Sequence, residues 1–187
     1  MSDFNQERRK ELLKLARTAI EEYILRGNKI KPPGNEELNV MRGVFVTLKI
    51  NGELRGCIGY IIPIRPLGTT IIDCAIAAAT EDPRFSALKP KELNKIKIEI
   101  SALSPLKRVK KIEEILVGTH GIIISKGLIR GLLLPQVATE YKWDRQTFLE
   151  QTCYKAGLPK DAWKEKDTII EIFSAEVFSE EELEAQE

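Results

Sequence analysis

The sequence has few of the residues from which disulfide frameworks and structural zinc sites are built. Its 187 residues include three cysteines, Cys57, Cys74 and Cys153, and a single histidine, His120. A zinc site of the usual four-ligand kind needs more cysteine and histidine at regular spacing, and a disulfide framework needs an even set of cysteines. We therefore predict free thiols and no metal site, while the sequence leaves any cofactor unknown.

Long apolar runs are also missing. No segment approaches the roughly 20 apolar residues that a membrane-spanning helix needs, and the charged N-terminal segment has no apolar core of the kind found in signal peptides. Methionine and cysteine are sparse, and the charged residues are mostly Glu and Lys, which is typical of proteins from thermophiles. We expect a cytoplasmic protein that does not enter a membrane.

The sequence also lacks an excess of charge of either sign. The chain has 29 Lys and Arg against 28 Asp and Glu, a net charge of +1, so it lacks the broad positive field that attracts nucleic acid. A short basic run at 107–111 has Glu113 and Glu114 as neighbours, which offset it. Nucleic acid is therefore not an expected partner.

The composition supports a folded core, because 43% of the residues are hydrophobic and 30% are charged. Apolar residues follow helical spacing in some segments and alternate in others, and Asn51-Gly52 is a strong hairpin signal. This irregular interleaving predicts an α+β fold whose mixed or mainly antiparallel sheet is packed by helices. The expected helices are 7–25, 67–79 and 144–155, and the expected strands are 44–50, 53–62, 95–103, 121–125, 128–134 and 168–178.

The segment 54–60 is an unusual strand because it contains Gly56 and Gly59. Glycines inside a strand reduce its stability and mark a bulge, a bend or a close approach by another group. In regular strand geometry Arg55 and Cys57 point to one face, where a guanidinium favours thiolate over thiol. Cys57 is then a candidate nucleophile or redox thiol, with Arg55 as a candidate catalytic residue. The alternative is that Cys57 is a small packed residue.

Other candidates depend on spatial proximity that the sequence does not show. His120 stands beside glycines, where an imidazole can act as a base, and with Cys57 it would form a thiolate pair. Asp82 and Arg84 form a charged pair in a turn, although Asp-Pro is first of all a turn signal. Glu99 projects from the polar face of its predicted strand and is a candidate for binding or for base catalysis.

Four segments resemble a known family: LRGCIG at 54–59, DPRF at 82–85, THGI at 119–122 and LLLPQVATEYKWD at 132–144. They are similar to the AMMECR family, named after a human chromosomal region linked to Alport syndrome, midface hypoplasia and elliptocytosis, and the chain looks like an archaeal or bacterial member. The family pattern falls here on Arg55, Gly56, Cys57, Ile58, Gly59, Asp82, Pro83, Arg84, Phe85, His120 and Gly121.

The resemblance implies one AMMECR-like domain over residues 1–187, with a larger α+β subdomain that contains both termini and a smaller inserted one. It implies no established reaction. It suggests Memo-like and radical-SAM proteins as partners in an uncharacterised pathway.

Two hypotheses stay open: a thiol-dependent or acid/base enzyme acting at Cys57 on a small molecule or peptide, and a non-catalytic ligand- or protein-binding module. In either, Gly56, Gly59, Glu99, Asp82 and Arg84 are the binding candidates.

Overall fold

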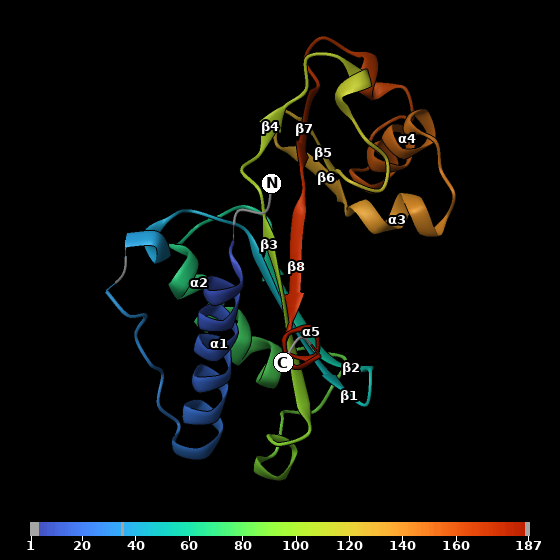
Figure 1. Ribbon diagram of the computed structural model, residues 1–187. Helices are drawn as coiled ribbons and strands as arrows, with labels where there is room; N and C mark the ends of the chain where they lie inside the picture. Colours follow the sequence, from blue (N-terminus) through green and yellow to red (C-terminus); the bar gives the residue numbers. More distant parts are fainter. Residues whose placement is uncertain (1–3, 35, 186–187) are drawn as a thin grey trace. The chain divides into compact units, whose positions relative to one another are not determined.

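The protein consists of two compact units, seen in a computed structural model that describes residues 4–34 and 36–185 (Figure 1). The first unit comprises Met1–Leu103 and Glu176–Glu187, and the second comprises Ser104–Ala175. The first unit therefore contains both ends of the chain, and the second unit is one continuous insertion within it. No helix among the described residues is long and apolar enough to cross a membrane.

The first unit contains a four-stranded sheet with the strand order β2-β1-β3-β8. β1 pairs antiparallel with both β2 and β3, and the β1–β2 hairpin turns at Asn51 and Gly52, which both have positive φ. These elements agree with the predicted hairpin and helices. The helices are α1 (Gln6–Arg26), η1 (Glu36–Asn39), α2 (Leu67–Thr80), η2 (Pro90–Glu92) and α5 (Glu180–Glu184), and the strands are β1 (Val44–Ile50), β2 (Glu53–Tyr60), β3 (Ile96–Leu103) and β8 (Ala175–Ser179).

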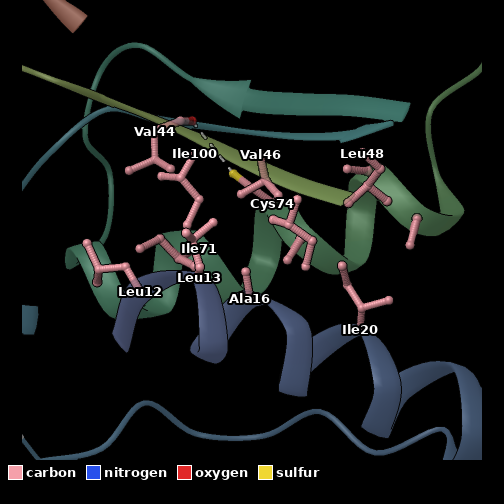
Figure 2. Packing of buried hydrophobic residues seen from close by; sticks show 14 of the residues in the cluster. Leu12, Leu13, Ala16, Ile20, Val44, Val46, Leu48, Ile71, Cys74 and Ile100 are labelled. Atoms are coloured by element: carbon pink, nitrogen blue, oxygen red, sulfur yellow. Dashed lines mark hydrogen bonds between the residues drawn. The ribbon is translucent and has the colours of Figure 1, made fainter. Parts of the chain in front are cut away.

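One face of this sheet is buried because apolar residues alternate along its strands. Ile98 and Ile100 of β3 are fully buried, and so are alternate residues of β1. Both α1 and α2 contribute to this core, and Cys74 lies inside it with Sγ 3.9 Å from the Val44 carbonyl oxygen (Figure 2). Burial raises the pKa of the Cys74 thiol to about 12, so this cysteine is a core residue, as predicted.

The other face of the sheet is polar and only half-buried. It carries the residues of β1 and β3 that alternate with the core positions, including Thr47, Lys49 and Glu99. The strict alternation over 95–103 predicted this arrangement of β3. We call it the polar face of the first sheet, and it presents several of the candidate residues.

The second unit has its own sheet, with the strand order β4-β7-β5-β6, and its own core. Fully buried Phe148 and Cys153 of α4 pack there with isoleucines of β5, so Cys153 is also a core residue, as predicted. The helices are η3 (Ile112–Glu114), α3 (Pro135–Glu140), α4 (Arg145–Lys155) and η4 (Ala162–Lys164), and the strands are β4 (Lys107–Arg108), β5 (Gly121–Lys126), β6 (Ile129–Leu133) and β7 (Ile169–Phe173).

The prediction of one strand over 168–178 is wrong. The segment forms two strands that belong to different sheets, β7 in the second unit and β8 in the first. They separate at Ser174, whose N–H donates to Ser104 Oγ at 3.0 Å while its carbonyl oxygen accepts from Ser104 N at 2.8 Å. An apolar pattern of period two is the same whether or not a chain changes sheets, so the sequence did not show the break.

Candidate functional site

The glycine–cysteine segment forms β2, which is an edge strand of the first sheet. Its register against β1 pairs Leu48 with Gly56 and Lys49 with Leu54, which leaves Arg55 as an extra residue. This is a β-bulge, a feature that redirects a side chain and bends a strand. The sequence argument placed Arg55 beside Cys57 by assuming a regular strand, and the bulge removes that assumption.

Arg55 is held by partners other than the thiol. Its Nε and Nη2 atoms donate to the two carboxylate oxygens of Glu92 at 2.9 and 3.3 Å, and Nη1 donates to the Ser86 carbonyl oxygen at 3.0 Å. The Arg55 guanidinium also lowers the pKa of Glu92 from its ordinary value by hydrogen bonding. None of the described hydrogen bonds of Arg55 goes to Cys57. The predicted pairing of Arg55 with the thiolate stays a prediction.

Cys57 lies half-buried on the polar face of the first sheet. It stands opposite Thr47, whose hydroxyl donates to Cys57 Sγ at 3.2 Å, and Thr47 in turn stands opposite Glu99 on β3. Glu99 forms an ion pair with Lys49 Nζ at 2.8 Å. The structure therefore brings Cys57 and Glu99 into one row across three strands, with Thr47 between them.

Asp82 fixes the backbone at Cys57. Its side chain is 2% exposed, and Oδ2 accepts from Cys57 N at 2.8 Å and from Arg84 Nη2 at 2.8 Å. Oδ1 accepts from the backbone N–H and Nε of Arg84. Mainly because of the hydrogen bonds from Arg84, the pKa of Asp82 lies well below its ordinary value. Asp82 thus satisfies an N–H on the open edge of β2, and the DPRF and glycine–cysteine segments form one structure.

The two glycines of the motif make room for other parts of the protein. A Cβ atom on Gly56 would lie 2.1 Å from the carbonyl oxygen of Ala78 in α2, and one on Gly59 would lie 2.3 Å from the ring of Phe45. The sequence predicted that a close neighbour needs this space. At both positions the neighbour in this structure belongs to the chain itself.

His120 belongs to the second unit, whereas the other candidate residues belong to the first. It directly precedes β5, and its Nδ1 atom accepts from Leu116 N at 3.1 Å. Burial lowers the pKa of His120 from its ordinary value. The pairing of Cys57 with His120 joins residues of different units and stays a prediction.

Two contacting residues were missed from the sequence. Counting back regularly from the hairpin turn would place Thr47 opposite Gly56, and only the bulge places it opposite Cys57. Glu92 lies 37 positions from Arg55, and no local pattern links the two. Among the described residues, no group of three or more His, Cys, Asp or Glu side chains is arranged to hold a metal ion.

Fold and site together define an α+β protein in which a bulged edge strand presents a cysteine and a buried aspartate caps that strand. The chain belongs to the AMMECR1 family, whose model matches residues 13–178. It is 47% identical over 182 residues to a protein of Pyrococcus furiosus, and the match covers 91% of this chain and 87% of the relative.

Two further comparisons agree with this assignment. A Methanopyrus kandleri protein is 49% identical over 184 residues, which covers 92% of this chain and 88% of the relative. The crystal structure of an uncharacterized protein from Pyrococcus horikoshii superimposes with a TM-score of 0.79 at 43% identity, and the match covers 95% of this chain and 94% of the other. These relatives are archaeal, in agreement with the type of member expected from the sequence.

Proposed function

We propose that Cys57 is the reactive thiol of a cytoplasmic enzyme that acts on a small molecule or a peptide side chain. The observation that carries this proposal is the hydrogen bond from the Thr47 hydroxyl to Cys57 Sγ, on a cysteine that is half-buried while Cys74 and Cys153 are fully buried. A donor to sulfur favours the thiolate, which is the nucleophilic form of cysteine. The N–H group of Cys57 donates to Asp82, so the backbone that carries the sulfur is held in place.

The remaining candidates have distinct roles in this proposal. Glu99, in the same row, serves as the base, and the ion pair with Lys49 Nζ at 2.8 Å holds its carboxylate in place. His120 serves as an alternative base supplied by the second unit. Arg55, Gly56 and Asp82 act as positioning residues, because their contacts shape β2 rather than touch the sulfur. Memo-like and radical-SAM proteins are the proposed partners, on the family resemblance alone.

The test is the alkylation rate of each cysteine in the folded protein, measured by iodoacetamide labelling and peptide mass spectrometry. Cys57 is expected to react faster than free cysteine at neutral pH, and Thr47→Val is expected to slow it severalfold. Thr18→Val, which removes an exposed hydroxyl from α1, serves as the matched control and leaves the rate unchanged. The thiol proposal is overturned if Cys57 is alkylated no faster than free cysteine and its rate is the same in Thr47→Val as in wild type. His120→Ala, in the same assay, tests the proposed pair.

A second function, a non-catalytic binding module, is favoured by a different observation. Arg55, Asp82 and Glu99 already have charged partners within the chain, so the motif can be a rigid surface rather than a reaction centre. This function predicts that Cys57→Ala retains binding to a Memo-like protein in a titration. Gly59→Val, which drives a side chain into Phe45, abolishes that binding. Loss of binding with Cys57→Ala in a folded protein would count against the binding module.

A further inference from the structure

A cavity of about 310 Å³ lies next to Arg55 in the first unit, and its lining does not include Cys57. One wall is Arg55 on β2, and the others come from the segment between α2 and β3. This volume is at the lower end of the range for pockets that hold small molecules. The lining residues are Arg55, Phe85, Ser86, Lys89, Lys91 and Glu92.

The cavity has an excess of positive charge. Arg55, Lys89 and Lys91 are three cations against the single carboxylate of Glu92, which leaves two positive charges in excess. Both oxygens of Glu92 are engaged, since Oε1 accepts from Arg55 and Oε2 accepts from Arg55 and from the backbone N–H of Lys89. Glu92 therefore orients the arginine, and the lysine ammonium groups remain for an anion. Like charges gathered in one hollow repel each other, and a bound anion relieves that repulsion.

Arg55 is prepared for a ligand before one arrives. Its side chain is 14% exposed and is fixed by Glu92 and Ser86, so little side-chain entropy is lost on binding. A guanidinium has five N–H donors, and the described hydrogen bonds use three of them. Donors therefore remain for an anion that enters the cavity.

Phe85 supplies an apolar wall near two cations. The centre of its ring lies 6.0 Å from Cζ of Arg55 and 5.5 Å from Cζ of Arg84, which is itself more than half exposed. A guanidinium group at this distance from an aromatic ring is weakly attracted to the ring, so the Phe85 ring keeps a defined place. A ligand here meets positive charge and an aromatic surface together.

We infer that this cavity binds a small phosphate monoester, with the phosphate held by Arg55, Lys89 and Lys91 and the organic group against Phe85. A phosphate monoester carries a charge of roughly −1.5 to −2 near neutral pH, which matches the two positive charges in excess better than a single carboxylate does. The cavity shares Arg55 with the strand that carries Cys57, but its test changes Lys89, Lys91 and Phe85, which have no role in the thiol proposal. Either proposal can therefore fail without the other.

The experiment is calorimetric titration of the full chain with phenyl phosphate at constant ionic strength. Lys89→Gln/Lys91→Gln is expected to weaken binding about tenfold or more, because two charge-assisted contacts are lost. Lys160→Gln/Lys166→Gln removes the same net charge from exposed positions of the second unit and is expected to leave the affinity within about twofold. Amide chemical-shift changes at Phe85 and Ser86 locate the bound probe.

Two further arms define the ligand class. Phe85→Leu is expected to weaken the binding of phenyl phosphate and to leave the binding of inorganic phosphate unchanged, since only phenyl phosphate carries a ring. Benzoate, with one charge, is expected to bind more weakly than phenyl phosphate. The inference is overturned by the absence of saturable binding, by equal losses in the two double-lysine variants, or by benzoate binding as tightly as phenyl phosphate.

Discussion

At Gly56 the absence of a side chain is a packing requirement, because the backbone of α2 occupies the space. The Cβ of an alanine there would lie 2.1 Å from the Ala78 carbonyl oxygen, and a helix backbone gives way less easily than a side chain. We expect Gly56→Ala to lower the free energy of unfolding by about 1–3 kcal/mol, as overpacked core substitutions do. Chemical denaturation measures this.

Gly34→Ala is the control for this prediction, because the Cβ position of Gly34 has nothing within 4 Å and its φ is not in the left-handed region. The change at Gly34 is expected to be neutral or slightly stabilising. Equal stability of the two variants would mean that α2 does not pack as closely on β2 as the structure describes.

Asp82 makes stability depend on pH through its lowered pKa. The pKa of this carboxyl group is lower in the folded state than in the unfolded state, where it is about 3.9. Its contribution to stability is therefore complete above about pH 3.9 and is lost as the pH falls toward the folded-state pKa. Asp82→Asn is therefore expected to be less stable than wild type by about 1–3 kcal/mol at pH 7. The difference shrinks below about pH 4.

Denaturant titrations at neutral and acidic pH measure this dependence. Asp144→Asn is a comparison from the second unit, because Asp144 also has a lowered pKa but is exposed at the N-cap of α4. Its effect is expected to be smaller. A stability difference between wild type and Asp82→Asn that stays constant across this pH range would show that the Asp82 charge does not stabilise the fold.

Among the elements of the first unit, α1, β3 and α5 are joined by one ion pair. Nε and Nη2 of Arg17 each donate to a carboxylate oxygen of Glu180 at 2.6 Å, and Arg17 also donates to backbone carbonyl oxygens at Leu93 and Ile96. Glu180 Oε2 accepts from Ile98 N at 2.9 Å. Glu180→Ala is expected to cost about 2 kcal/mol, because it leaves partly buried donors without their charged acceptor.

The matched control is Glu22→Ala, which breaks the ion pair between Glu22 and Arg26 at the exposed end of α1. Pairs of this kind contribute about 0.5 kcal/mol or less. Thermal unfolding of both variants measures the contrast. A melting temperature for Glu180→Ala as high as that for Glu22→Ala would show that the pair does not join these elements energetically.

For the whole molecule, the two cores belong to different units and share no residue. Phe148 is fully buried in the core of the second unit. Phe148→Ala is expected to cost about 3–5 kcal/mol through the cavity it leaves. Native-state hydrogen exchange is expected to show lost protection in β5 and β7 while β1 and β3 keep theirs.

Ile100→Ala, in the core of the first unit, is the reciprocal variant and should reverse the pattern of protection. Equal loss of protection in both sheets with either variant would show that the two units unfold as one cooperative body. That outcome would overturn the prediction of separate stability.

The sequence by itself determined those features that depend on neighbouring residues. Helix α1, the hairpin at Asn51-Gly52 and the alternation along β3 follow from local periodicity and turn chemistry, and buried Cys74 follows from its apolar surroundings. The LRGCIG motif identified the family in the same way, because a motif is itself a local pattern.

Only the tertiary structure decided the contacts between residues distant in the chain. The bulge at Arg55, its pairing with Glu92 and the cap that Asp82 places on Cys57 N all depend on how β2 meets the segment after α2. The division of 168–178 between two sheets likewise falls at Ser174, whose hydrogen-bond partner Ser104 lies 70 positions away. Local patterns fix which face of an element is apolar, whereas a bulge or a distant partner is chosen by the free energy of the packed whole.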